Sequence, residues 1–130
     1  MFESSEKFLI INKTKGKLPS LPFVEFKEKV LGKNYELSMA IVSKSKIHFL
    51  NKTFRKVDSP TDILSFPLDD QNGEIFICQE IAKKKAPKFD KPYENFLSFL
   101  FIHGLVHLKG YDHGEEMEKI ETKYRKYFKI

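Results

Sequence analysis

Residues 93–113 read YENFLSFLFIHGLVHLKGYDH, and this stretch decides how the rest of the chain must fold. Apolar residues occur on all sides of a helix built over 93–108: Phe96, Leu97, Phe99, Leu100, Phe101, Ile102, Leu105 and Val106. A helix that is apolar around its whole circumference is normally buried. We therefore expect a helix over 93–108 at the centre of the domain, packed against a sheet.

The same stretch holds three of the chain's four histidines. His103 and His107 are four residues apart and share one face of the expected helix. Gly110 can end that helix, because glycine accepts the left-handed conformation common at helix ends, and the chain can then bring His113 back. One histidine on an apolar helix is usually a hydrogen-bonded core residue, but that interpretation does not explain three with this spacing. We predict that His103, His107 and His113 bind one metal ion and leave a coordination position open for water or substrate.

The composition is that of a small globular protein. The chain has 130 residues, of which 41% are hydrophobic and 14% aromatic, so we expect one domain over 1–130. The net charge of +5 suits a polyanionic partner. A lysine-rich composition explains the charge equally well, because only Arg55 and Arg125 among the 23 basic residues are arginines.

The sequence predicts a cytoplasmic protein without a membrane partner. Cys78 is the only cysteine, so no disulfide can form within the chain, as is usual in the cytosol. The first residues lack the basic start and apolar run of a signal peptide. The longest apolar run, over 96–102, is too short to span a bilayer.

Hydrophobic periodicity predicts both strands and helices. Strands are expected over 8–12, 35–42, 63–66 (stopped by Pro67) and 74–78, the last two antiparallel across the turn-forming residues 69–73. Helices are expected from Ser20 to Gly32, after Ser43 with Ile47, Leu50 and Phe54 facing the core, and over 80–85, 93–108 and 114–127. The predicted fold is α/β (α+β): a small mixed four-stranded sheet packed with helices around the buried central helix that carries the H-x3-H-x5-H site.

The predicted metal site indicates hydrolysis of an anionic substrate. Three neutral imidazoles leave the metal's charge uncancelled, which favours a group such as phosphate, and such a site can lower the pKa of bound water to about 7. The histidine spacing is also that of the metzincin proteases, H-E-x-x-H-x-x-G-x-x-H. The catalytic glutamate of that pattern, however, falls at Gly104, which argues against peptide cleavage.

Arg55 is the second candidate functional residue. It stands at the end of an expected helix, just before the polar loop 56–62, in a chain that otherwise uses lysine. An arginine in such a place suggests a planar fork that binds phosphate with two hydrogen bonds. The plain alternative is an ion pair with Asp58 or Asp62.

Three segments resemble the YbeY family of bacterial endoribonucleases, also called rRNA maturation factors. They are LNKTFRKVDSPTDILSFP (50–67), GEIFIC (73–78), where the family more often has Gly-Asp-Ile, and HGLVHLKGYDH (103–113). They occur in the family's order and spacing. Residues 1–34 match only in general layout.

The resemblance implies an α/β domain with one Zn²⁺ bound by the three histidines. It implies cleavage of single-stranded RNA, a role in maturing the 3′ end of 16S rRNA and in ribosome quality control, and no DNA partner. The expected partners are the rRNA precursor and the small ribosomal subunit. The resemblance also assigns the family's functionally important arginine to Arg55, and the family itself has glycine where Gly104 stands.

The resulting hypothesis gives each residue a role. The metal polarises a phosphodiester oxygen, activates water, or both, while Arg55 binds the phosphate and stabilises charge in the transition state. Lys52 and Lys56 attract the RNA backbone. Stacking of unpaired bases would need aromatic surfaces, for which Phe54 and Tyr111 are candidates, with packing as the alternative for each. The rival functions are a metal-dependent hydrolase of another substrate, including peptides, and a non-enzymatic ribosome assembly factor with a structural zinc.

Overall fold

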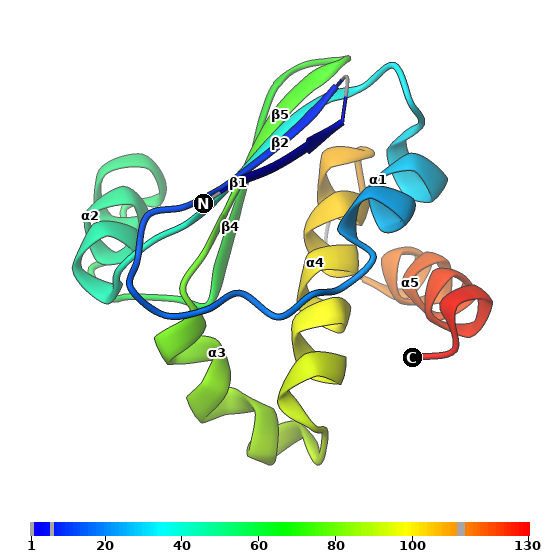
Figure 1. Cartoon of the computed structure of the whole chain (residues 1–130). Coiled ribbons are helices and arrows are strands. Elements are labelled where there is room, and N and C mark those ends of the chain that lie inside the picture. Colours follow the sequence, from blue (N-terminus) through cyan, green and yellow to red (C-terminus); the bar gives the residue numbers. More distant parts are fainter. Residues whose placement is uncertain (1, 6, 112–113) are drawn as a thin grey trace.

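One mixed sheet forms the centre of the protein. The computed structural model describes residues 2–5, 7–111 and 114–130 (Figure 1). The strands lie in the order β1-β2-β3-β5-β4, of which β2, β3 and β5 are parallel and the edge strands β1 and β4 are antiparallel to their neighbours. Their bounds are β1 Phe2–Ser5, β2 Phe8–Asn12, β3 Glu36–Ile41, β4 Ile63–Asp69 and β5 Asn72–Ile77.

The α/β class and the mixed sheet are confirmed, and the four predicted strands are β2 to β5. The sheet has one strand more than predicted, because β1 pairs with β2 in the register Phe2 with Ile11. The sequence of β1, FESS, has a single apolar residue and shows no alternation, so periodicity does not indicate it. Backbone hydrogen bonds to β2 hold β1 in place, although its own sequence has no strand pattern.

The prediction that Pro67 stops the third strand was wrong. Strand β4 continues through Pro67 to Asp69, with an irregular register between these two residues. Proline has no N–H to donate, so sheets accept it mainly on edge strands and at bulges. Because β4 is the edge strand, Pro67 does not end it.

Helices cover both faces of the sheet. Their bounds are α1 Phe23–Leu31, α2 Lys44–Arg55, α3 Gln79–Lys85, the 3₁₀ helix η1 Ala86–Phe89, α4 Tyr93–Leu108 and α5 Glu115–Phe128. Helices α1, α4 and α5 lie on one side of the sheet and α2 on the other (Figure 1). Phe101 and Leu105 of α4 are completely buried, which confirms α4 as the central helix. Among the described residues, no helix is long and apolar enough to cross a membrane.

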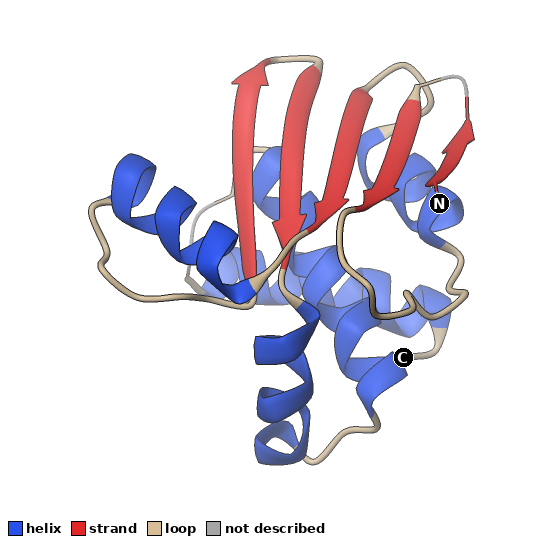
Figure 2. Ribbon diagram, turned by 60° about the vertical axis from the view of Figure 1, so that its left-hand side comes forward, coloured by secondary structure: helices blue, strands red, loops and turns tan. Residues whose placement is uncertain are grey.

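Helix α2 follows its predicted pattern except at one residue. The Ser43 hydroxyl caps it by accepting a hydrogen bond from the Lys46 amide over 3.2 Å, and Ile47 and Leu50 are buried as predicted. Phe54 was expected to face the core, but its side chain is 64% exposed. Phe54 lies on the apolar stripe of the helix, as predicted. The helix, however, extends beside the edge strand β4 (Figure 2), so the sheet covers Ile47 and Leu50 but leaves Phe54 largely exposed.

Gly104 brings α4 unusually close to the sheet. A Cβ atom at this position would lie 2.9 Å from both Ile63 Cδ1 and Ser65 Oγ, and 3.3 Å from Ile75 Cδ1. Real Cβ atoms do not approach other atoms so closely without a shift of the surroundings. The glycine therefore sets how near the histidine-bearing helix lies to β4.

Candidate active site

His103 and His107 lie together in the last two turns of α4, as their spacing predicted. Their ring centroids are 4.7 Å apart and the ring planes are nearly perpendicular, at 87°. Both side chains are partly exposed and line a cavity of about 300 Å³ between α4, β4 and the end of α2. Arg55 lines the same cavity. The structure thus brings together two of the predicted metal ligands and the predicted phosphate-binding residue.

Each of these histidines is oriented through its Nδ1 atom. His103 Nδ1 contacts the Glu121 carboxylate, and His107 Nδ1 lies 3.1 Å from the backbone oxygen of Tyr111. Both partners accept hydrogen bonds, so each neutral ring carries its proton on Nδ1 and its lone pair on Nε2. A histidine held through one nitrogen by a carboxylate or carbonyl is the usual arrangement of a metal ligand.

Sequence reasoning missed Glu121, which was treated only as part of the last helix. Its side chain is 8% exposed, because α5 packs beside α4 and points this carboxylate at His103. A signal was present in the sequence. Glu121 lies four residues after Met117 and three before Tyr124, which are both buried, so it falls on the apolar face of its helix.

The predicted third ligand, His113, lies outside the described residues. Within residues 2–5, 7–111 and 114–130 there is no group of three or more His, Cys, Asp or Glu side chains arranged to bind a metal. The donor set of His103 and His107 fits a divalent metal, because two Nε2 lone pairs are oriented by acceptors behind them. The three-histidine site therefore stays a prediction, and the arrangement of His103 and His107 supports it.

Arg55 is held at the edge of the sheet. Its Nη2 atom donates to the Ser65 carbonyl of β4 over 3.0 Å, and its guanidinium carbon lies 5.7 Å from the Phe66 ring centroid. Among the described residues this is one hydrogen bond for a group with five N–H donors. The guanidinium is thus fixed in direction while most of its donors are left for a ligand.

The plain alternative for Arg55 was an ion pair with Asp58 or Asp62. Asp58 instead lies 2.7 Å from Nε2 of His48, and Asp62 lies 3.4 Å from Nζ of Lys85. Within the part of the chain that the structure describes, neither carboxylate pairs with Arg55. The His48 side chain also holds the pKa of Asp58 below its usual value by donating to it.

Ser65 connects the two halves of the site, and sequence reasoning missed it as well. Its hydroxyl donates to the Gly104 carbonyl of α4 over 3.3 Å, and its own carbonyl accepts from Arg55. The side chain is 6% exposed. In the sequence it is one of many serines, so only the packing of α4 on β4 reveals this position.

Lys52 and Lys56, predicted to contact RNA, are exposed near Arg55 but do not line the cavity. Lys52 Nζ lies 3.9 Å from the Asp58 carboxylate, and Lys56 Nζ donates to the Thr53 carbonyl over 3.2 Å. Their contact with RNA stays a prediction. Tyr111, a candidate for base stacking, is instead half-buried against the main core.

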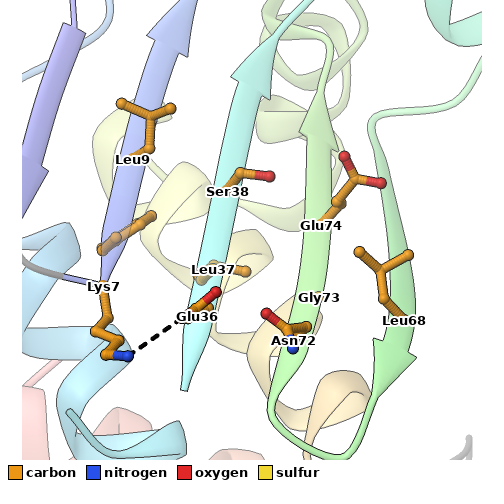
Figure 3. Close-up of a pocket in the computed structure, with 10 residues that line it drawn as sticks. Lys7, Leu9, Glu36, Leu37, Ser38, Leu68, Asn72, Gly73 and Glu74 are labelled. Carbon is orange, nitrogen blue, oxygen red and sulfur yellow. Dashed lines mark hydrogen bonds and ion pairs between the residues drawn. The ribbon is translucent and has the colours of Figure 1, made fainter. Parts of the chain in front are cut away.

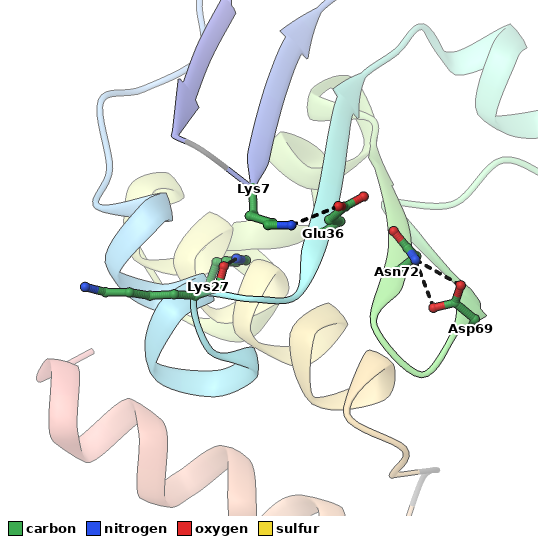
Figure 4. Close-up of polar contacts among 6 residues, drawn as sticks. Lys7, Lys27, Glu36, Asp69 and Asn72 are labelled. Carbon is green, nitrogen blue, oxygen red and sulfur yellow. Dashed lines mark hydrogen bonds and ion pairs between the residues drawn. The ribbon is translucent and has the colours of Figure 1, made fainter.

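A larger cavity, of about 460 Å³, lies on the sheet itself (Figure 3). Its polar side chains include Glu74 and an ion pair between Lys7 and Glu36 of 3.1 Å, and no histidine or arginine occurs among the described residues that line it. Nearby, Asp69 accepts hydrogen bonds from the Gln71 amide and the Asn72 side chain, which lower its pKa (Figure 4). These contacts fix the β4–β5 turn and suggest no chemistry.

The chain matches a protein-family model, described as Endoribonuclease YbeY, over residues 12–129. This is most of the domain and includes β4, α4 and the cavity between them. The chain belongs to the YbeY endoribonuclease family. The sequence resemblance is thereby confirmed, and it extends well beyond residues 50–113.

Individual YbeY proteins agree with the family assignment. The chain is 38% identical over 103 residues to Endoribonuclease YbeY of Thermotoga neapolitana, covering 78% of this chain and 68% of that protein. It is 42% identical over 95 residues to Endoribonuclease YbeY of Aquifex aeolicus, covering 66% of this chain and 63% of that protein. The match thus spans about two thirds of these relatives.

The fold also agrees with an experimentally determined structure. The solution structure of TM1509 from Thermotoga maritima superposes with a TM-score of 0.63, at 31% identity, covering 94% of this chain and 91% of that one. The likeness extends over nearly the whole domain. The arrangement of α2, β4 and α4 that forms the cavity therefore belongs to a fold already observed.

Proposed function

We propose that this protein is a metal-dependent endoribonuclease that cleaves single-stranded RNA. The observation that carries the proposal is the shared cavity, in which Arg55 from α2 meets His103 and His107 from α4. Membership of the YbeY endoribonuclease family supports the same reaction. On this basis we expect it to act in the cytoplasm on the rRNA precursor of the small ribosomal subunit, in 16S 3′-end maturation and ribosome quality control.

We infer that His103, His107 and His113 hold one Zn²⁺ ion. When bound, the ion would supply a Lewis acid and a water of lowered pKa. The hydrogen bonds from Nδ1 of His103 and His107 support this assignment, because they direct both Nε2 lone pairs toward a ligand. Glu121 has the additional role of raising the basicity of the His103 ring.

Arg55 binds the phosphate of the scissile bond. Its guanidinium is directed by the Ser65 carbonyl and lies over the Phe66 ring, so it loses little freedom when it binds. Two parallel N–H donors match two phosphate oxygens and stabilise the charge that develops there in the transition state. Lys52 and Lys56 attract the flanking RNA backbone through their charge.

The test is cleavage of a labelled RNA that carries the 3′ end of a 16S precursor. The wild type should cleave it in the single-stranded form, while folded Arg55→Ala and His107→Ala proteins should lose activity by about 10²-fold or more. Lys29→Ala, which lies on α1 outside the cavity, serves as the matched control and should keep wild-type activity. Full activity of Arg55→Ala would overturn the role of this residue.

Metal content separates the proposed enzyme from its rivals. The wild type should hold one metal per chain and His113→Ala clearly less; a wild type without metal would contradict the proposed site. Hydrolysis of an unfolded protein that His107→Ala abolishes, with RNA untouched, would replace the nuclease by a peptidase. An Arg55→Ala protein that binds metal and fully restores ribosome maturation would favour an assembly factor with structural zinc.

A further inference from the structure

Phe54 presents a large apolar ring to solvent near the end of α2. Its side chain is 64% exposed, although it belongs to the apolar stripe of α2 whose other members, Ile47 and Leu50, are buried. Arg55, the next residue, lines the cavity. The exposed ring beside Arg55 is open to a ligand.

The ring is held in place from behind by other aromatic side chains. Phe54 meets Phe66 of β4 edge-on, with centroids 5.7 Å apart, and Phe66 meets Phe76 of β5 in the same way at 5.9 Å. The Arg55 guanidinium lies over the same Phe66 ring. Phe54 and Arg55 therefore share one support, and the position of one is fixed relative to the other.

The surroundings of the ring select a polyanion over an apolar partner. None of the twelve residues of α2 is acidic, whereas Lys44, Lys46, Lys52 and Arg55 are basic. Lys56 follows directly after the helix. Asp58, in the loop after the helix, pairs with His48 and Lys52. A flat apolar ring surrounded by positive charge suits a nucleotide, because the base can stack on the ring while the basic side chains attract its phosphate.

We propose that Phe54 is a stacking platform for the base next to the phosphate bound by Arg55. The proposal rests on the proposed ribonuclease function and adds to it the residue that recognises an unpaired nucleotide. Stacking requires an open base face, which a base inside a duplex does not offer. The Phe54 ring would therefore favour single-stranded RNA at this site.

The chain contains no tryptophan, so a Phe54→Trp variant carries a single indole fluorophore at the platform. Titration with single-stranded oligoadenylate should quench its fluorescence, while the duplex of oligoadenylate with oligouridylate should not. Phe89→Trp is the matched control, because Phe89 is 52% exposed but lies on η1 and contacts Phe96 and Phe99 rather than the Phe66 ring that supports Phe54 and Arg55. Its fluorescence should not respond to either RNA.

Affinity supplies the second measurement. Phe54→Ala should weaken binding of oligoadenylate by about 5- to 150-fold, the usual range for loss of one stacked base, and Phe54→Tyr should restore it. Replacing the bases of the oligonucleotide by abasic nucleotides should make wild type and Phe54→Ala bind equally. A Phe54→Ala loss that is as large on the abasic strand would overturn the proposal, because the ring would then act through packing.

The outcomes also separate this proposal from the proposed function. Cleavage of RNA by the wild type without quenching in Phe54→Trp would overturn the platform alone, and the exposed ring would then fit a protein partner. Quenching by single-stranded RNA without any cleavage would support the platform and contradict the nuclease. If duplex and single-stranded RNA quenched the fluorescence equally, base stacking would not be the cause of the quenching, because a duplex offers no open base face.

Discussion

The Ser65 hydroxyl donates to the Gly104 carbonyl over 3.3 Å, and this contact fixes the edge strand β4 to the histidine-bearing helix α4. Arg55 donates to the carbonyl of the same serine, so the predicted phosphate-binding residue is positioned through β4 relative to His103 and His107. The close approach requires glycine at 104, because a Cβ there would lie 2.9 Å from Ser65 Oγ. The distance between the two halves of the site thus depends on one small residue.

Gly104→Ala should therefore destabilise the protein. Alanine favours a helix over glycine by about 1 kcal/mol, but overpacking a filled interior usually costs about 1–3 kcal/mol, so we expect a net loss of up to about 2 kcal/mol. Denaturant unfolding measures this loss, and RNA cleavage should fall as well. Gly16→Ala is the control, since nothing lies within 4 Å of its Cβ position; equal stability of both variants would contradict the close packing.

Glu121→Gln should weaken metal binding without unfolding the protein. The amide keeps the volume of the side chain but removes the charge that orients His103 and raises its basicity. Loss of such a partner usually lowers metal affinity by about 10- to 100-fold. Competition with a chromophoric zinc chelator measures the affinity. Glu118→Gln, an exposed change on the same helix, should leave it unchanged, and an unaltered affinity in Glu121→Gln would refute the role of this carboxylate.

Arg55→Lys tests whether the planar fork matters rather than the charge. Lysine keeps the positive charge but cannot hold the Ser65 carbonyl and two phosphate oxygens at once. We expect a fall in kcat of about 10²-fold, comparable to the loss of one directed donor in other enzymes, with a small change in KM. Arg125→Lys, the only other arginine change available, is the control for the substitution itself. Wild-type kcat in Arg55→Lys would show that charge alone suffices.

The pair Lys52→Ala and Lys56→Ala should weaken RNA binding through the loss of backbone contacts. If each lysine neutralises one phosphate, the slope of log K against log salt should become less steep by about 1.4, because each contact on a single strand contributes about 0.7. Binding titrations at several salt concentrations measure the slope. The control pair Lys29→Ala and Lys126→Ala lies on α1 and α5, away from α2 (Figure 1), and should keep the wild-type slope.

The burial of Lys27 predicts that the free energy of unfolding depends on pH, independently of the active site. The residue is 1% exposed, and its ammonium donates to the Lys33 carbonyl over 3.2 Å. Burial lowers its pKa from the ordinary 10.5 in the folded state. Between the two pKa values the unfolded chain binds more protons, so the free energy of unfolding should rise with pH in this alkaline window.

Lys27→Met removes that effect. The variant should be more stable than the wild type at pH 7, and the difference should shrink toward zero as the pH approaches 10.5. Denaturation curves from pH 7 to 10.5 provide the measurement, with the exposed Lys29→Met on the same helix as control. If the stability difference between wild type and Lys27→Met did not change with pH, burial of the Lys27 ammonium would not destabilise the folded protein, which would contradict the prediction.

The sequence by itself determined most of the elements and named the main candidate residues. The all-round apolar stretch 93–108 specified the central helix to its end residues, and local spacing alone placed His103 and His107 on one face. Repeating patterns and helix caps depend only on near neighbours in the chain, and these are visible in a sequence. The contrast of Arg55 with the lysines elsewhere in the chain made it a candidate, and the family resemblance then assigned it the functional role.

Only the tertiary structure decided which residues complete the site. Glu121 reaches His103 because α5 packs beside α4, and Ser65 joins Arg55 to Gly104 because β4 lies at the sheet edge. The exposure of Phe54 follows from where the sheet ends beneath α2, which periodicity does not report. Contacts between two helices, or between a helix and a strand, depend on how the elements are placed against each other. Long-range packing sets that placement, and local sequence patterns do not report it.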